Sequence, residues 1–152
     1  MEEFKTLTSI AVKLLEPNID TDQILPSRYI QKPRENDFSK YLFEDVRKSY
    51  FSENNSYFTL DEPGFKESRI IITGTNFGCG SSREHAVWAL VDSGFKVLIG
   101  TTFGDIFYSN CLKNGLLPIR LVEHDFEVIN NISSRILKTK LTIDLNEQLI
   151  RT

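Results

Sequence analysis

The residues best suited to chemistry lie together in one short stretch, residues 74–85, where glycines alternate with polar and charged side chains. Gly78 and Gly80 have no side chain, so the backbone around them can approach a ligand closely. Ser81 supplies a hydroxyl group, and Arg83 supplies a planar guanidinium that binds a carboxylate or a phosphate through two parallel hydrogen bonds. The stretch therefore predicts a site that binds an oxyanion.

The elements on either side of this stretch would hold it in a favourable place. Residues 69–74 form a short β-branched run typical of a buried strand, and residues 83–93 have the apolar spacing of a helix. The loop between them joins the carboxyl end of a strand to the amino end of a helix, where free backbone N–H groups and the helix dipole attract anions. Ser81 and Glu84 also have the spacing of a capping box at the start of that helix.

A helix start of this kind does not require a ligand, because glycine turns and serine caps begin many helices that bind nothing. The Asn, Ser, Arg and His side chains around the two glycines exceed what a cap needs, which favours a site. Common templates do not match: no lysine follows Gly80 as in a P-loop, and the dinucleotide fingerprint would need a glycine in place of Arg83. A thiol nucleophile at Cys79 with His85 as its base is an alternative that the sequence leaves open.

Three polar residues near the N-terminus, Asn18, Asp20 and Asp22, imitate the opening of a calcium-binding loop. Such a loop needs glycine at its sixth position and a bidentate acid at its twelfth, where this chain has Gln23 and Tyr29. We therefore expect no calcium site. The acids are either turn residues or supports for an active-site arginine, and the sequence does not decide between these two roles.

Other polar side chains are interpreted from their surroundings. His85 and His124 are the only histidines, and we expect one to pack near the loop and the other to lie at the surface. Asn110 falls on the otherwise apolar stripe of a predicted helix. A buried amide there would hold backbone or the loop above it, or would sit at the edge of the stripe.

The remaining pattern predicts one α/β domain over residues 1–152, with a mixed sheet and a βαβαβ core. Thr102 with Asp105 predicts an N-cap for a second helix that ends at Asn114, and Pro118 places the third strand of the core at an edge or an end. A long excursion is expected over about residues 29–63. The predicted strands lie at residues 8–15, 57–60, 69–74, 96–100, 116–122 and 137–145.

Composition and charge narrow the class of protein. The 152 residues carry 18 basic and 21 acidic side chains, a net charge of −3, so the chain lacks the basic field that non-specific nucleic-acid binding needs. No apolar run is long enough for a signal peptide or a membrane span, and we expect a cytoplasmic protein. Cys79 and Cys111 are too few for a disulfide framework and cannot alone supply a structural zinc or iron–sulfur site, so we expect two free thiols.

Four stretches of this sequence are similar to one known family. Residues 76–86, NFGCGSSREHA, resemble the signature of the aconitase swivel domain, and the whole set resembles the small subunits of isopropylmalate dehydratases within that family. The chain stops near Thr152, earlier than bacterial members usually do, so we expect a C-terminal tail to be missing. The three supporting stretches, in the family's order, are residues 18–26 (NIDTDQILP), 41–45 (YLFED) and 110–118 (NCLKNGLLP).

The resemblance implies a fold, a reaction and a partner. The fold would be a swivelling β/β/α aconitase-type domain. The reaction would be that of a hydro-lyase in leucine biosynthesis, which interconverts 2-isopropylmalate and 3-isopropylmalate by removing and re-adding water. A large subunit would carry a 4Fe-4S cluster and complete the site for this dicarboxylate substrate, and this chain would hold no cofactor itself.

The resemblance also implies roles for individual residues. Ser81 would take the proton from carbon, and Arg83 with Ser82 would bind a substrate carboxylate, next to the accessible backbone at Gly80. Asp22 matches a family acid near the serine, and we expect it to orient the base or Arg83. A serine hydroxyl is a weak base, so it would need an arginine, backbone donors and exclusion of water to act as an alkoxide.

Residues 28–32 occupy the segment that differs between isopropylmalate and homoaconitate enzymes, so we expect Arg28, Tyr29 and Ile30 to contact the variable group of the substrate. A surface salt bridge is the alternative role for Arg28. Three other functions stay open. They are the small subunit of a homoaconitate hydratase, the small subunit of a methylmalate or citraconate hydratase, and a dicarboxylate-binding module without catalysis.

Overall fold

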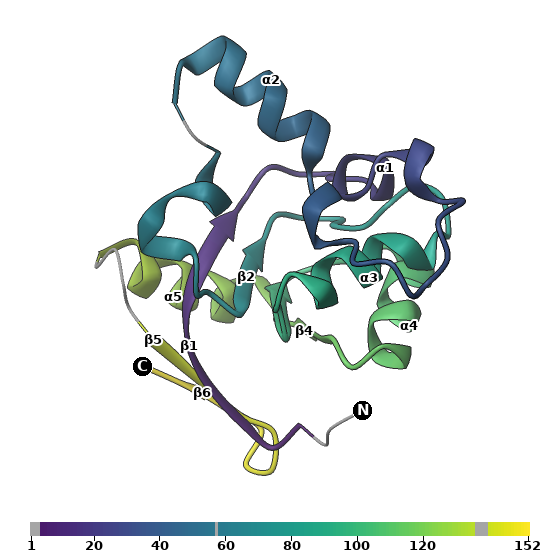
Figure 1. The fold of residues 1–152 in the computed structure, drawn as a ribbon. Helices are drawn as coiled ribbons and strands as arrows, with labels where there is room; N and C mark the ends of the chain where they lie inside the picture. The colour runs from purple at the N-terminus through teal and green to yellow at the C-terminus, as the bar shows by residue number, and fades with distance from the viewer. Residues whose placement is uncertain (1–3, 57, 136–139) are drawn as a thin grey trace.

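The computed structural model describes residues 4–56, 58–135 and 140–152, which contain one six-stranded sheet (Figure 1). The strands are β1 (Thr6–Leu14), β2 (Ile70–Thr73), β3 (Val97–Gly100), β4 (Leu117–Arg120), β5 (Lys140–Asp144) and β6 (Leu149–Arg151). Their order across the sheet is β4-β3-β2-β1-β5-β6; β1 to β4 run parallel, and β5 and β6 are antiparallel to their neighbours. The mixed sheet confirms the predicted α/β class, and β4 lies at an edge, as Pro118 indicates.

Helices connect the parallel strands and confirm the βαβαβ core. The helix α3 links β2 to β3, and α4 links β3 to β4, so the carboxyl ends of β1, β2 and β3 meet at one edge of the sheet. A further helix, α5, follows β4 and was not predicted from the sequence. The helices are α1 (Thr21–Ile24), α2 (Glu44–Asn54), α3 (Glu84–Asp92), α4 (Asp105–Lys113) and α5 (Glu123–Arg135).

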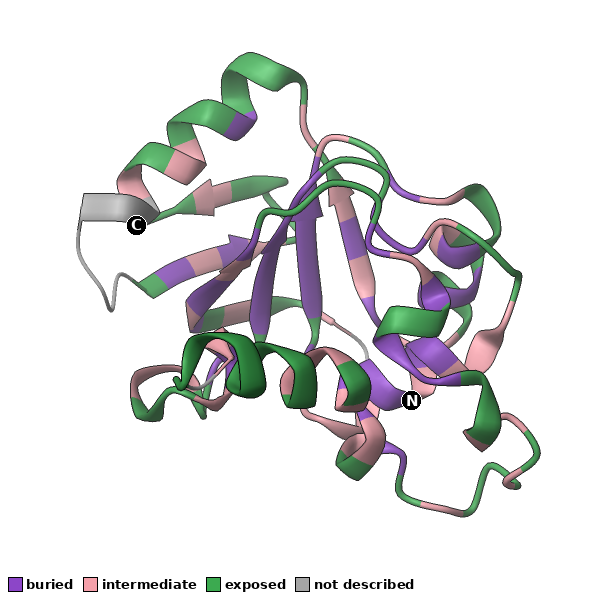
Figure 2. Ribbon diagram, turned by 90° about the horizontal axis from the view of Figure 1, so that it is seen from above, coloured by how far each residue is buried: buried purple, intermediate pink, exposed green. Residues whose placement is uncertain are grey.

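The sheet is buried on both faces, and the core therefore has two parts. On one face, Ile71 and Leu98 pack with the apolar residues of α3 and α4 and of the excursion between β1 and β2. On the other face, Ile70 and Ile99 pack with Phe126 of α5. Figure 2 shows the buried residues concentrated on these strands, as parallel strands covered on both faces require.

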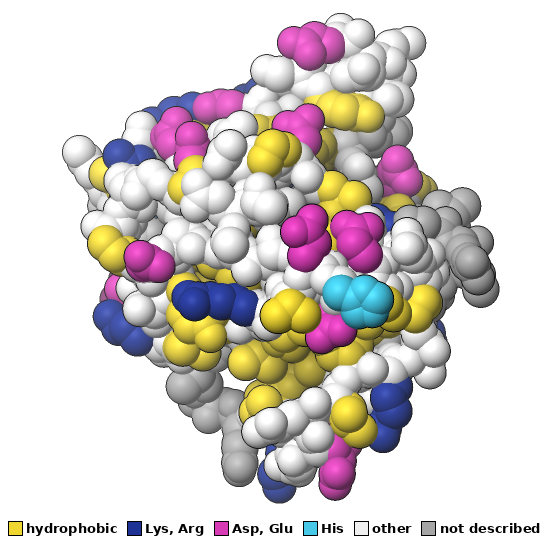
Figure 3. Space-filling model, turned by 180° about the vertical axis from the view of Figure 1, so that it is seen from behind, with side chains coloured by type: hydrophobic (Ala, Val, Ile, Leu, Met, Phe, Trp, Pro, Cys, Tyr) yellow, Lys and Arg dark blue, Asp and Glu magenta, His cyan; other side chains and the backbone are white. Residues whose placement is uncertain are grey.

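The face that carries α5 is less completely covered than the other. A groove of about 500 Å³ lies between α5, the edge strand β4 and the β5–β6 hairpin. Leu117, Ile129 and Leu149 are among the residues that line it. Figure 3 shows apolar side chains gathered in this hollow.

Between β1 and β2, the described residues form α1, α2 and four single turns of 3-10 helix. The predicted strand at residues 57–60 is wrong for its described part, because Thr59–Asp61 forms one of these turns; Tyr57 lies outside the described residues. Strand β1 pairs with β2 over Ala11–Leu14 and with β5 over Thr6–Ile10. The predicted C-terminal strand is confirmed over Lys140–Asp144, and its predicted residues 137–139 also lie outside the described residues.

Candidate active site

The loop after β2 is held between the segments that follow β1 and β3. On one side, the N–H of Gly78 donates to the carbonyl oxygen of Ile19 at 2.7 Å. The N–H of Thr21 donates to the carbonyl oxygen of Cys79 at 2.9 Å. On the other side, the N–H of Gly104 donates to the carbonyl oxygen of Phe77 at 3.0 Å. Three connections that are far apart in the sequence are thus joined by backbone hydrogen bonds at the carboxyl edge of the sheet.

Glycine is required at the centre of this arrangement. Gly78 has a φ of +78°, and a Cβ atom there would collide with the ring of Phe107 on α4. Gly80 has a φ of +94° and is exposed, so its backbone is open to a ligand, as predicted. The two glycines therefore have different roles: Gly78 allows α4 to pack against the loop, and Gly80 turns the chain toward Ser81.

Ser81 lies at the surface, where a buried threonine holds it. The hydroxyl of Thr21 donates to the carbonyl oxygen of Ser81 at 3.0 Å, and the two hydroxyl oxygens are 3.3 Å apart. Only 2 % of Thr21 is exposed, so this contact comes from below the loop. Sequence reasoning missed Thr21, although it directly precedes Asp22 in one of the family-like stretches.

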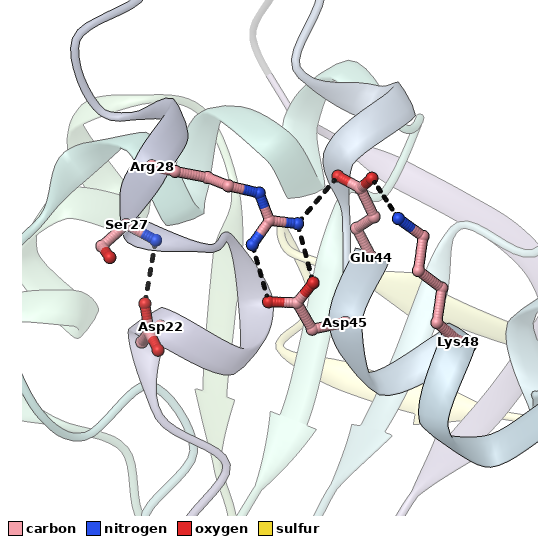
Figure 4. A network of polar contacts seen from close by, with 6 residues as sticks. All are labelled: Asp22, Ser27, Arg28, Glu44, Asp45 and Lys48. Carbon is pink, nitrogen blue, oxygen red and sulfur yellow. Dashed lines mark hydrogen bonds and ion pairs between the residues drawn. The ribbon is translucent and has the colours of Figure 1, made fainter. Parts of the chain in front are cut away.

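Arg83 and Asp22 are brought together, as the sequence predicted for an acid that orients the arginine. A guanidinium nitrogen of Arg83 is 3.7 Å from Oδ1 of Asp22, and the Arg83 side chain is 31 % exposed. The same Oδ1 accepts a hydrogen bond of 2.8 Å from the N–H of Ser27 (Figure 4). Arg83 therefore has a fixed neighbour and still faces solvent.

The position of Asp22 is set by the start of α1. Asp20 caps this helix: its Oδ1 accepts from the N–H of Gln23 at 2.8 Å, and the Gln23 side chain accepts from the N–H of Asp20 at 2.9 Å. This is a capping box that the sequence reasoning did not identify. Asp20 is thus a cap and turn residue, whereas Asp22 lies 3.7 Å from the guanidinium of Arg83.

The predicted capping box between Ser81 and Glu84 is wrong. The N-cap of α3 is Arg83, and its side chain does not cap the helix. The hydroxyl of Ser81 contacts Thr21 and not the start of the helix. The Glu84 carboxylate accepts a hydrogen bond of 2.9 Å from the side chain of Asn114, which connects α3 to the end of α4. Ser81 is consequently not engaged in capping the helix.

The predicted N-cap of Thr102 with Asp105 is also wrong. The Thr102 hydroxyl accepts a hydrogen bond of 2.7 Å from the N–H of Asn76. The N-cap of α4 is Gly104, which has no side chain to cap the helix. Asn76 also donates to the side chain of Asn18 at 3.0 Å, which ties the loop to the segment after β1. Polar residues around the loop thus connect segments to one another instead of ending helices.

Ser82 is exposed, and its carbonyl oxygen lies 3.5 Å from the side-chain nitrogen of Asn110, which donates to it. Asn110 is 8 % exposed on α4. This confirms the prediction that a buried amide at this position holds the loop above it.

Arg28 and the residues after it form a separate cluster beside α2. The Arg28 guanidinium donates two hydrogen bonds, of 2.9 and 2.7 Å, to the carboxylate of Asp45 and lies 3.6 Å from Glu44 (Figure 4). These bonds hold the pKa of the Asp45 carboxyl below its usual range. Tyr29 stacks on the ring of Tyr41, and Ile30 is half-buried next to it. In this structure Arg28 makes the surface ion pair that was its alternative role.

The histidines lie where the sequence placed them: His124 is exposed, and His85 packs against Trp88 with ring centroids 4.4 Å apart. Burial lowers the pKa of His85, which favours its neutral form. Both cysteines are free thiols, as predicted; burial raises the pKa of Cys111 far above its usual range, which makes it inert. In the part of the chain that the structure describes, Cys79 makes no hydrogen bond with His85.

Among residues 4–56, 58–135 and 140–152, no three His, Cys, Asp or Glu side chains come together in a way that could hold a metal ion. The same residues contain no helix that is both long and apolar enough to cross a membrane. The chemistry that the loop itself offers is a hydroxyl, a guanidinium and free backbone donors. Within the described residues, the N–H groups of Gly80, Ser81 and Ser82 donate to no protein acceptor, so they remain available to an anion.

Comparison with known proteins identifies relatives that span nearly the whole chain. The model of the aconitase C-terminal domain family matches residues 1–124. The 3-isopropylmalate dehydratase small subunit of Brucella anthropi is 43 % identical over 150 residues, which cover 99 % of this chain and 75 % of that protein. The corresponding protein of Brucella canis has the same identity and coverage.

Two solved structures share the fold. The structure of a 3-isopropylmalate dehydratase from Methanocaldococcus jannaschii superposes with a TM-score of 0.67 at 28 % identity and covers 95 % of this chain and 74 % of that one. The structure of aconitase X from Thermococcus kodakaraensis has a TM-score of 0.53 at 10 % identity, with coverage of 96 % and 88 %. At that identity, the second likeness concerns the fold alone.

Proposed function

This chain belongs to the aconitase C-terminal domain family, among the small subunits of 3-isopropylmalate dehydratase, and we propose that its loop at residues 76–83 supplies the base and the carboxylate-binding groups of that enzyme. The function is that of a hydro-lyase subunit in leucine biosynthesis. The complete enzyme interconverts 2-isopropylmalate and 3-isopropylmalate by removing water from one and adding it back to give the other.

The proton-transfer step is assigned to Ser81. In the dehydration direction a proton leaves carbon and a hydroxide leaves the neighbouring carbon, so the elements of water are lost and a double bond forms. The Ser81 hydroxyl is exposed and needs to be ionised to accept that proton. Thr21 fixes the position of the hydroxyl, at 3.3 Å, and its own hydroxyl is close enough to donate to an alkoxide after a rotation.

The substrate carboxylate is assigned to Arg83 and the free backbone donors. Arg83 is the N-cap of α3, and the N–H groups of Ser81 and Ser82 lie just before it, on the side of the helix whose dipole adds a positive potential. A carboxylate bound there would lie beside the carbon that loses its proton. The same positive groups would stabilise the negative charge that develops in the transition state. The observation that carries this proposal is that one loop presents an exposed serine hydroxyl held by Thr21 and, two residues later, an arginine held beside Asp22.

The loop is open to water, and the proposed mechanism needs water to be excluded. The Brucella relatives are named as small subunits, which supports a large partner subunit, and we propose that this partner covers this edge of the sheet. We assign the 4Fe-4S cluster to that partner, where it would supply a Lewis acid for the departing hydroxyl. This chain contributes the residues that bind, orient and deprotonate the substrate.

The substrate is proposed to be isopropylmalate because the relatives carry that name. Homoaconitate, methylmalate and citraconate remain alternatives of the same chemistry. If residues 28–32 contact the variable group, Arg28 would have to exchange its bonds to Asp45 for bonds to the substrate. Steady-state rates on each acid, measured with the complete enzyme, separate these possibilities.

A dicarboxylate-binding module without catalysis makes a different prediction. Such a module would bind isopropylmalate tightly as the free chain, and Ser81→Ala would leave both its binding and its cellular output unchanged. The proposed subunit would bind weakly alone because half of its site is missing. Isothermal titration calorimetry of the isolated chain with isopropylmalate distinguishes the two.

The proposal as a whole is tested by reconstitution. The purified chain is mixed with a cluster-loaded large subunit, and conversion of 2-isopropylmalate is followed. We expect no turnover from either chain alone and turnover that saturates at a fixed ratio of the two. Turnover by the isolated chain, or an inactive mixture with a large subunit that a known small subunit activates, would contradict the proposal.

A further inference from the structure

A polar cavity lies at the amino ends of the parallel strands, at the opposite edge of the sheet from the catalytic loop. It has a volume of about 490 Å³, and four of the residues that line it are cations. Lys5, Arg69 and Lys96 directly precede β1, β2 and β3, and Lys113 is the last residue of α4. Four separate elements therefore contribute exposed cationic residues to the lining of one space at the amino ends of the parallel strands.

These cations have few acidic partners. Among the described residues, Lys5, Arg69 and Lys96 form no ion pair with a carboxylate, and Lys113 reaches Glu84 only at 4.0 Å. Arg69 and Lys96 occupy neighbouring positions on adjacent strands, since the N–H of Lys96 donates to the carbonyl oxygen of Arg69 at 2.8 Å. Like charges at neighbouring strand positions repel each other, so this arrangement destabilises the empty domain.

The helix dipole accounts for part of this cluster. A cation at the last residue of α4 interacts favourably with the negative end of that helix, which explains Lys113 without a ligand. Lys5 and Arg69 precede strands and do not lie at the end of a helix. The helix dipole therefore does not explain Lys5 and Arg69, and neither of them forms an ion pair with a carboxylate among the described residues.

We propose that this cavity binds a small molecule that carries two or more phosphate groups. A chain of phosphates spreads several negative charges over the distance between cations from different elements, and the fork of Arg69 matches the oxygens of one phosphate. The cavity is too large for a single phosphate, and Leu7 and Val91 add apolar lining beside the charges. A dicarboxylate carries only two charges and would leave about half of the cations unpaired.

The site would be connected to the catalytic loop through the end of α4. Lys113 and Asn114 line the cavity and also contact Glu84, which directly follows Arg83. A bound phosphate would compete with Glu84 for Lys113. The ligand would therefore act on the residue next to the catalytic arginine.

The test is calorimetric titration of the full chain with inorganic tripolyphosphate and with ATP, at about 50 mM salt. We expect saturable binding that weakens at about 200 mM salt, because exposed charge pairs are screened. Arg69→Gln and Lys96→Gln should each weaken binding about tenfold or more, as expected when one charge-assisted bond is lost. Equal affinity for tripolyphosphate and ATP would show that only the phosphates are recognised. Tighter binding of ATP would show that the nucleoside is also bound. Either result supports the site.

Two control variants and one stability measurement separate binding in this cavity from a general effect of charge. Lys140→Gln removes the same charge from β5, outside the cavity, and should change the affinity less than twofold. Arg83→Gln leaves Glu84 and Lys113 in place and should also change the affinity less than twofold. Without ligand, Arg69→Gln should be at least as resistant to urea as the parent chain, because a repulsion is removed. Absence of binding, an equal loss in Lys140→Gln, or a loss in Arg83→Gln would each overturn the proposal.

Discussion

Charged side chains are held differently at the two ends of the parallel strands. At the carboxyl edge, backbone hydrogen bonds join three connections, and the arginine that faces solvent has a fixed acidic neighbour. At the amino edge, four cations extend into a cavity on flexible side chains, and three of them form no ion pair among the described residues. The difference teaches that a reaction needs groups fixed by the backbone, whereas attraction of an anion needs only charge in the right place.

The strongest test of this contrast is Ser81→Ala at the carboxyl edge. Loss of the proton acceptor should lower the turnover of the reconstituted enzyme by about 10³–10⁴-fold, the upper range for a general base. Binding to the large subunit should change little, because the substitution removes a single hydroxyl, whose hydrogen-bond partner among the described residues is Thr21. Ser109→Ala, an exposed serine on α4, serves as the matched control and should retain full turnover. An active Ser81→Ala enzyme would remove the main distinction between the two edges.

Arg83→Lys tests whether geometry as well as charge matters at the carboxyl edge. One ammonium cannot form the two parallel bonds to a carboxylate, so we expect kcat/KM to fall by about 10²–10³-fold. The control is Arg151→Lys on β6, which should leave kinetics unchanged. If Arg83→Lys retains most of its kcat/KM, then charge alone is sufficient at this edge, and the contrast with the amino edge fails.

Two glycine substitutions compare the rigidity of the edges directly. Gly78→Ala places a methyl group against the Phe107 ring at a positive φ, and should lower the free energy of unfolding by about 2–3 kcal/mol. Gly94→Ala, after α3 at the other edge, has a similar φ of +95° but no atom within 4 Å of the added Cβ. We expect it to cost only about 1 kcal/mol. Urea denaturation of both variants measures the difference, and equal losses would refute the tighter packing of the catalytic loop.

The smallest expected effect is on stability at mildly acidic pH. Burial lowers the pKa of His85 in the folded chain, so the unfolded chain binds more protons below its ordinary pKa of 6.5. The free energy of unfolding should therefore fall as the pH is lowered from about 7 to about 5. His85→Gln should reduce this slope, whereas His124→Gln, at an exposed position, should not. Identical slopes in all three proteins would mean that His85 is not held in its neutral form beneath the loop.

The fold of the parallel half is predictable because its signals are local. Uninterrupted β-branched runs such as residues 70–72 are buried on both faces, and the glycine-rich loop can be found without knowing what surrounds it. Helix α5 was missed although its signal is also local. Its first turn carries Glu123 and Asp125, and its apolar residues Phe126 and Ile129, which pack against the sheet, have helical spacing.

The details of the site were less predictable than its location. Ser81 and Thr102 both have the spacing of helix caps, yet both find partners on other segments, Thr21 and Asn76. A cap is a contact within a few residues, whereas these hydrogen bonds join positions that are close only after the strands have aligned. Sequence spacing could therefore identify the polar residues but not their partners.

The central claim is that Ser81 takes the proton from the substrate carbon, and the most direct measurement is exchange of that proton with solvent. The reconstituted enzyme is incubated with 2-isopropylmalate in D2O, and deuterium at carbon is followed by mass spectrometry in both recovered substrate and product. We predict that the parent enzyme incorporates deuterium and that the Ser81→Ala enzyme, with substrate bound and the complex intact, incorporates none above the level of the large subunit alone. Incorporation by Ser81→Ala at the parent rate would contradict the account and assign the base to another group.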